Sequence, residues 1–205
     1  VLGVSALNMG DASAAETWHS KALVIREQQG AESLEVAASL ANMGLVVERR
    51  GDLAGAEELH KRVAGIEERL APDSLDFAGT CDNLGVLAIH RGHLLEAERW
   101  FRKALAVRER IHAPELALMA SHVNLGLVAK LRKDYGAAAV LWGRALEIQE
   151  RLAPDTLDTA GTYNNLGVLY KDQGDLTAAQ NWQRKALELR RKLAPGSVGE
   201  ATSTA

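Results

Sequence analysis

The sequence predicts an all-α fold built by repetition of one pair of helices. Three observations support this prediction. The same residue types return every 41 positions along the chain. Aromatic residues make up only 4% of the 205 residues, whereas alanine and leucine are abundant, which favours helices over strands. Only four prolines interrupt the chain, so long helices have room to form.

The period is clearest in the triplet Asn-Leu-Gly. Its copies lie 41 residues apart: Asn83-Leu84-Gly85, Asn124-Leu125-Gly126 and Asn165-Leu166-Gly167, with Asn42-Met43-Gly44 as a variant and Leu2-Gly3 as a remnant. A second position, 12 residues after the glycine, is always alanine: Ala15, Ala56, Ala97, Ala138 and Ala179. Agreement of several such repeat columns in one register indicates a repeat architecture.

Each unit divides into two helices. The first helix carries the triplet, as in residues 75–91, and the second follows after a short turn, as in residues 94–110. The turns Gly51-Asp52 and Gly174-Asp175 place glycine just after a helix end and aspartate at the next N-cap. Apolar residues recur at spacings of three and four in the second helix, as on one helical face. Proline-containing turns close three units, at Pro72, Pro114 and Pro154.

Some units depart from this pattern. Lys133 replaces the glycine before one second helix, and His93 replaces the aspartate before another. The proline turn near residues 111–123 is shortened and shifted, and Val63-Ala64 stands where Ala-Leu is expected. We expect local variation in helix crossing at these places and no change of fold.

The residues together resemble the tetratricopeptide repeat family. Gly85 is followed by Ala97, Phe101 and Ala104 at the spacing of the family signature. The period of 41, against the usual one of about 34, and the segment 164–170 are similar to the long repeats of kinesin light chains and of bacterial multidomain proteins. The resemblance implies a right-handed α-solenoid of about four and a half repeats, with units starting near residues 1, 42, 83, 124 and 165.

The repeat register predicts two regions. Residues 1–195 form the repeat array, and residues 196–205, which are rich in glycine, serine, threonine and alanine, form a flexible tail. The chain begins at Val1 without a methionine and in the middle of a unit, so we interpret it as part of a longer protein.

The resemblance places the asparagines of the triplet on a concave groove formed by the first helices. An amide donates and accepts hydrogen bonds, so it can pair with the backbone of an extended peptide. The alternative is that these asparagines only bridge backbone groups of neighbouring repeats. The candidate groove residues are Asn42, Asn83, Asn124, Asn164, Asn165, Asp82, Leu45, Val86, Leu127, Val168, Lys130 and Lys171. Lys130 and Lys171 would favour an acidic partner segment, although a solvated surface explains them equally well.

Residues with catalytic or metal-binding chemistry are scattered. His90 and His93 flank a turn without a second cluster, so we expect no metal site. His122 and Cys81 share a repeat column, so they are a full repeat apart and are expected to pack between helices. Trp18, Trp100 and Trp182 share another column on the second helix, where packing is a better explanation than a recognition stripe. We therefore predict neither an enzyme nor a cofactor.

The composition also limits the class of partner. The net charge of −3, without runs of like charge, argues against nucleic acid, and no apolar segment is long enough to cross a membrane. We expect a cytoplasmic scaffold that binds a peptide segment of another protein in its groove. The alternatives are a sensor or regulatory arm of a larger multidomain enzyme or effector and self-association through the end repeats.

Overall fold

The structure is a computed structural model that describes residue 21, residues 23–26 and residues 32–194. The beginning of the first predicted unit and the predicted tail at residues 196–205 lie outside these residues. Apart from turns, the described residues form helices and no strand, which confirms the all-α prediction. The chain divides into two compact units, one ending at His112 and one starting at Ala113.

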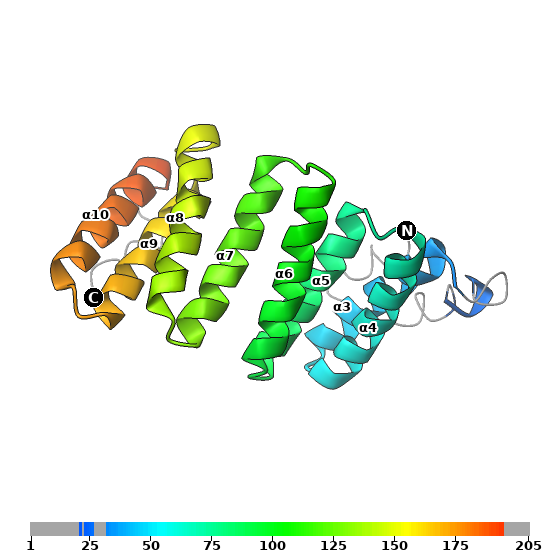
Figure 1. The fold of residues 1–205 in the computed structure, drawn as a ribbon. Helices are drawn as coiled ribbons and strands as arrows, with labels where there is room; N and C mark the ends of the chain where they lie inside the picture. Colours follow the sequence, from blue (N-terminus) through cyan, green and yellow to red (C-terminus); the bar gives the residue numbers. More distant parts are fainter. Residues whose placement is uncertain (1–20, 22, 27–31, 195–205) are drawn as a thin grey trace. The chain divides into compact units, whose positions relative to one another are not determined.

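Residues 32–194 form two helical hairpins in each unit (Figure 1). In the first unit, α3 (Leu34–Arg49) pairs with α4 (Leu53–Leu70), and α5 (Leu75–His90) pairs with α6 (Leu94–Arg110). In the second unit, α7 (Glu115–Leu131) pairs with α8 (Tyr135–Leu152), and α9 (Leu157–Asp172) pairs with α10 (Leu176–Leu193). Within each unit, the second helix of the first hairpin also packs against the first helix of the next.

Local capping explains where most helices begin. Asp52, Asp134 and Asp175 cap the second helices, and each carboxylate accepts a hydrogen bond from the backbone N–H three residues later. The hydroxyls of Ser33, Ser74 and Thr156 cap first helices in the same way. Before α4 and α10, Gly51 and Gly174 take a φ of +85°, which glycine adopts without steric cost. The predicted Gly-Asp turn is therefore confirmed.

Two of the departures from the repeat pattern coincide with helices that begin without a side-chain cap. His93 precedes α6, and Pro114 precedes α7 in the shifted turn; neither side chain makes a capping hydrogen bond. Lys133 adopts a φ of +62°, so the chain forms the same left-handed turn with a side chain that disfavours it. The helices still pair into hairpins at these sites, so the departures affect only the turns in which they occur.

The two helices of a hairpin approach each other at the glycine of the triplet. A Cβ on Gly85 would lie 2.6 Å from the Phe101 ring, and one on Gly126 would lie 2.3 Å from Nε1 of Trp142. Phe101 and Trp142 are both buried. Nε1 of Trp142 donates a hydrogen bond to the Val123 carbonyl over 3.0 Å, so its polar atom is satisfied. The glycine therefore makes room for a bulky residue of the second helix.

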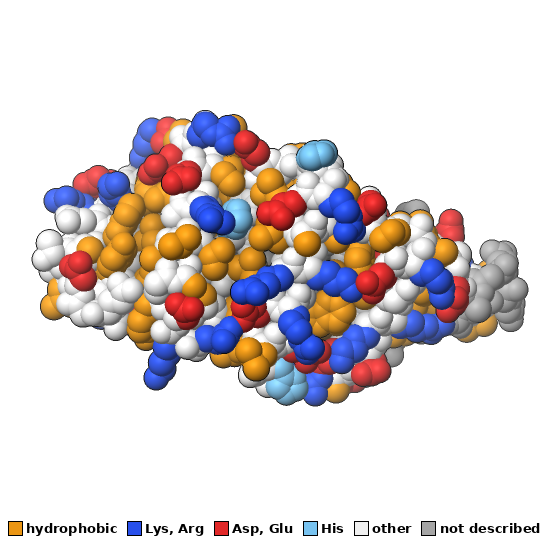
Figure 2. All heavy atoms as spheres, in the orientation of Figure 1, with side chains coloured by type: hydrophobic (Ala, Val, Ile, Leu, Met, Phe, Trp, Pro, Cys, Tyr) orange, Lys and Arg blue, Asp and Glu red, His pale blue; other side chains and the backbone are white. Residues whose placement is uncertain are grey.

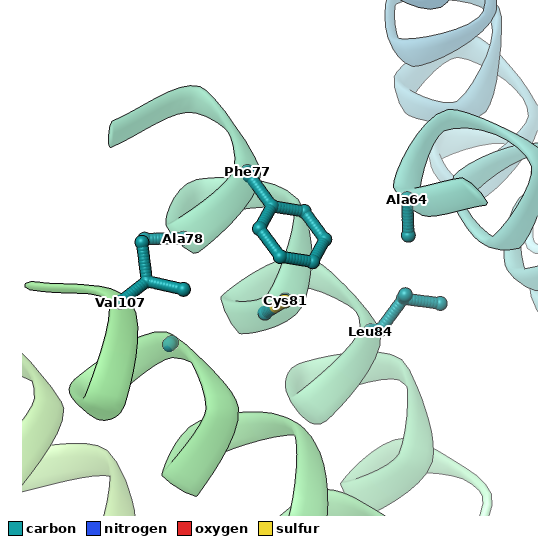
Figure 3. Close-up of a cluster of buried hydrophobic side chains, with 7 residues drawn as sticks. Ala64, Phe77, Ala78, Cys81, Leu84 and Val107 are labelled. Carbon is teal, nitrogen blue, oxygen red and sulfur yellow. The ribbon is translucent and has the colours of Figure 1, made fainter. Parts of the chain in front are cut away.

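Stacking of successive hairpins closes the core. In the first unit, Phe77, Cys81 and Leu84 of α5 lie between Ala64 of α4 and Val107 of α6 (Figure 3). Burial raises the pKa of the Cys81 thiol to about 12, as expected for a packing residue. Trp100 packs against the same cluster, in agreement with the packing interpretation of its column.

An ion pair joins the open end of each hairpin. A basic residue in the last turn of the second helix reaches an acidic residue at or just before the start of the first helix. The pairs are Arg69–Glu32, Arg110–Asp73, Arg151–Glu115 and Lys192–Asp155. Their side chains are largely exposed, so each pair contributes at most about 1 kcal/mol. Charged side chains of both signs are interspersed on the face drawn in Figure 2.

The first prediction concerns Lys133. Lys133→Gly should raise the free energy of unfolding by about 1 kcal/mol, because glycine removes the steric cost of a positive φ. The midpoint of urea denaturation measures the change. Arg132→Gly is the matched control, since Arg132 has a φ of −81° and should gain nothing from glycine. Equal effects of the two substitutions would contradict the explanation.

The second prediction concerns His60, which occupies the bulky position opposite Gly44. His60 is fully buried, and within the described part of the chain neither ring nitrogen has a hydrogen-bond partner. Burial lowers its pKa, although the Glu48 carboxylate opposes this shift. The unfolded chain therefore takes up the proton first, and stability should fall as the pH drops below about 6.5.

His60→Phe should weaken this acid dependence and raise stability at pH 7 by about 1 kcal/mol, because it removes two unsatisfied polar atoms. Urea denaturation at several pH values between 5 and 8 measures both effects. His90→Gln is the control, since His90 is exposed at the end of α5. An unchanged acid slope in His60→Phe would refute this role of His60.

Candidate functional site

In the described part of each unit, a pocket lies between two first helices and also contacts the second helix that connects them. The α3–α5 pocket has a volume of about 510 Å³ and the α7–α9 pocket a volume of about 310 Å³. The same repeat columns line both, because the hairpins of the two units repeat the same geometry. The shared columns are Ala38/Ala120, Ala41/Val123, Asn42/Asn124, Glu67/Gln149, Asp76/Asp158, Gly79/Gly161, Thr80/Thr162 and Asn83/Asn165.

The four asparagines of the triplet lie at these pockets. Asn42 and Asn83 line the α3–α5 pocket, and Asn124 and Asn165 line the α7–α9 pocket. Each pocket therefore has an amide on both sides, one from each first helix. Asn83 is exposed and the other three are half-buried. Such a pair of amides has donors and acceptors for the backbone of an extended segment that crosses the pocket.

The apolar candidates lie one helical turn after the asparagines. Leu45, Val86 and Leu127 are 42%, 36% and 40% exposed, and Val168 is half-buried. Each follows its asparagine by three residues, so amide and apolar groups share one face of each first helix. Large apolar side chains that recur on the exposed face of successive helices are typical of a binding surface.

Two of the three charged candidates, Asp82 and Lys130, form ion pairs within their own units. Asp82 Oδ2 lies 2.5 Å from Nη2 of Arg108, and Arg108 is buried. Lys130 Nζ lies 3.4 Å from Oδ2 of Asp172, one hairpin further on. Asp82, Lys130, Asn164 and Lys171 are not among the described residues that line the pockets. The pockets therefore bring together the four asparagines of the triplet, whereas these four candidates and the apolar candidates Leu45, Val86, Leu127 and Val168 lie outside the described linings.

The floor of each pocket contains polar groups that the sequence analysis did not identify. Glu67 of α4 and Gln149 of α8 are buried, and one side-chain oxygen of each has no hydrogen-bond partner among the described residues. The hydroxyl of Thr80 hydrogen-bonds to the Glu67 carboxylate. Arg26, in the same repeat column as Glu67, also bonds to the hydroxyl of the next first helix, but here the guanidinium donates and the Ser39 hydroxyl accepts.

A sequence signal for this floor exists. One column of the first helix always carries a hydroxyl: Ser39, Thr80, Ser121 and Thr162. The column of the second helix that lies 13 residues before it is always polar: Arg26, Glu67, Arg108 and Gln149. Two columns that remain polar next to the core indicate a polar contact between successive repeats.

The residues considered for other chemistry are separate from the pockets. His90 ends α5, and His93 lies before α6 with Nδ1 3.7 Å from the Glu96 carboxylate. Trp182 stacks on Tyr163 at a ring-centroid distance of 5.7 Å, and Trp18 lies outside the described residues. No helix among the described residues is long and apolar enough to cross a membrane.

Sequence comparison identifies the class of protein. One profile described as tetratricopeptide repeat matches residues 2–68 and 116–192, and a second profile with the same description matches residues 77–115. The chain therefore belongs to the tetratricopeptide repeat family, as the Asn-Leu-Gly register predicted. No curated protein matches the chain.

Solved structures share the fold. BtubC (BKLC) from P. vanneervenii has a TM-score of 0.84 at 24% identity, with 94% of this chain and 78% of that chain covered. A putative kinesin light chain from Podosopora anserina with nearly identical TPR-like repeats has a TM-score of 0.78 at 17% identity, with 94% and 93% covered. The apo form of RapI has a TM-score of 0.84 at 17% identity, with 98% and 77% covered. These similarities confirm the predicted α-solenoid and the likeness to kinesin light chain repeats.

The third prediction separates the structural role of Asp82 from a role in the groove. Asp82→Asn should lower the free energy of unfolding by about 2 kcal/mol, because it leaves the buried Arg108 guanidinium opposite a neutral group. Asp172→Asn is the matched control. Lys130, the partner of Asp172, is more exposed than Arg108. Loss of the Lys130–Asp172 ion pair should therefore lower the free energy of unfolding by less than about 1 kcal/mol. If the two substitutions shift the denaturation midpoint by the same amount, the structural role of Asp82 is contradicted.

Proposed function

We propose that the chain is a protein-interaction scaffold that binds an extended segment of a partner protein along its first helices. The carrying observation is the recurrence of one set of columns at a pocket in both units, with an asparagine on each side. The exposed apolar residues Leu45, Val86 and Leu127 supply contact area beside these amides. The arrangement supports binding rather than catalysis, because its repeated elements are amides and apolar side chains.

Backbone recognition explains why the same amide recurs. A peptide backbone offers an N–H and a C=O at every residue whatever its sequence, and an asparagine side chain matches both. The columns that vary between repeats would then determine which side chains are accepted. Affinity would arise from several modest contacts added along the segment, as in other peptide-binding grooves.

The fourth prediction tests this function with peptides selected from a displayed random 12-residue library on the full chain. Asn83→Ala should weaken binding of a selected peptide about fivefold to tenfold, because one or two hydrogen bonds are lost. Asn165→Ala tests the second unit in the same way. Fluorescence anisotropy measures the affinity, and thermal melting measures stability, which should change little.

Asn181→Ala is the matched control. Asn181 is an exposed asparagine of α10, outside both pockets, whose Oδ1 accepts a hydrogen bond from Arg184 over 3.2 Å. Its substitution should leave affinity unchanged. Unchanged binding by Asn83→Ala together with a large fall in melting temperature would support the alternative, in which the asparagine only bridges repeats.

A further inference from the structure

The α3–α5 pocket has an acidic floor. Glu67 is only 7% exposed, its Oε2 has no hydrogen-bond partner among the described residues, and Thr80 provides a single hydroxyl. Asp76 lines the same pocket from the first turn of α5. Among the described residues that line this pocket, none is a lysine or an arginine. Glu67 of α4 and Asp76 of α5 therefore line one pocket, and no cation of the described residues shares that lining.

Burial of the Glu67 carboxylate costs free energy. Burial raises the pKa of Glu67, and the negative charge of Asp76 raises it further. A buried carboxylate oxygen without a partner costs free energy that a positively charged donor would recover. The lining of the pocket is thus suited to a cationic guest.

The second unit supplies the neutral counterpart of this site. Gln149 occupies the repeat column of Glu67 and is 2% exposed, and its Oε1 has no hydrogen-bond partner in the residues that the structure describes. Asp158 occupies the column of Asp76. The two pockets therefore have asparagines in equivalent columns and several wall columns in common, and at the floor one has a carboxylate where the other has an amide.

We propose that the α3–α5 pocket accepts a lysine or arginine side chain of the bound segment, whose charged group pairs with Glu67 and Asp76. This inference rests on the proposed function, since the side chain belongs to a segment lying across Asn42 and Asn83. The walls fit such a guest, because Ala38, Ala41 and Gly79 can contact an aliphatic stem. The α7–α9 pocket, with Gln149, lacks this preference for charge.

The test is a nuclear magnetic resonance titration of the full chain with three capped tripeptides: acetyl-Ala-Arg-Ala-amide and its analogues with citrulline or glutamate in place of arginine. Citrulline keeps the shape of arginine and removes its charge. The side-chain amide signals of Asn42 and Asn83 report on the α3–α5 pocket, and those of Asn124 and Asn165 report on the other. The signals thus give an affinity for each pocket separately.

In the α3–α5 pocket, arginine should bind about tenfold more tightly than citrulline, because hydrogen bonds to a charged group are the stronger ones. Glutamate should bind least. Glu67→Gln should reduce the preference to less than about threefold, and Asp76→Asn, at an exposed residue, should reduce it in part. Gln149→Glu is the reciprocal variant and should create a preference for arginine at the Asn124 and Asn165 signals.

The outcomes separate this inference from the proposed function. Equal affinities for arginine and citrulline at Asn42 and Asn83 would overturn the cationic guest but leave peptide binding intact. A preference that survives both Glu67→Gln and Asp76→Asn would also overturn it. If no tripeptide shifts any of the four asparagine signals, both this inference and the groove itself are refuted.

Discussion

The close approach of paired helices at the glycine of the triplet is the constraint on which the rest of the structure depends. Gly44, Gly85, Gly126 and Gly167 face His60, Phe101, Trp142 and Gln183, and a Cβ at any of them would come within 2.8 Å of that side chain. The glycine fixes which face of the first helix packs inward. The asparagine two residues earlier is rotated by about 200° and lies on the opposite face. Helix packing and presentation of the asparagines are therefore consequences of one local geometry.

This geometry explains what the sequence could predict. The helix pairs and their boundaries follow from local signals, since glycine and aspartate act on the turn in which they stand. The asparagines lie at the pockets because their helical phase relative to the glycine is fixed. Asp82 differs, because its helical phase did not reveal its ion pair with Arg108, 26 residues away. The floor was missed for a related reason, since Glu67 meets Thr80 only when successive hairpins stack.

Two variable columns have different roles, one in helix packing and the other at the pockets. The bulky column opposite the glycine holds histidine, phenylalanine, tryptophan or glutamine, and its members lie inside a hairpin, away from both pockets. Changes there alter how well one hairpin packs and how it responds to pH. The floor column holds Arg26, Glu67, Arg108 and Gln149, and of these Glu67 and Gln149 line the two pockets. Changes in that column alter the charge offered to a guest while the asparagines remain in place.

The floor column also shows why recognition and stability are not fully separable. Glu67 follows Ile66, a buried core residue, so its backbone is held by the packing of α4. The hydrogen bond from the Thr80 hydroxyl explains why a polar residue is found at this column. It is a single hydrogen bond, however, and a carboxylate can accept several. Glutamine at the same position keeps the polar contact without a buried charge. The hydrogen bond to Thr80 therefore accounts for a polar residue at this column. It does not account for a buried negative charge at Glu67, which a positive group of the bound segment would offset.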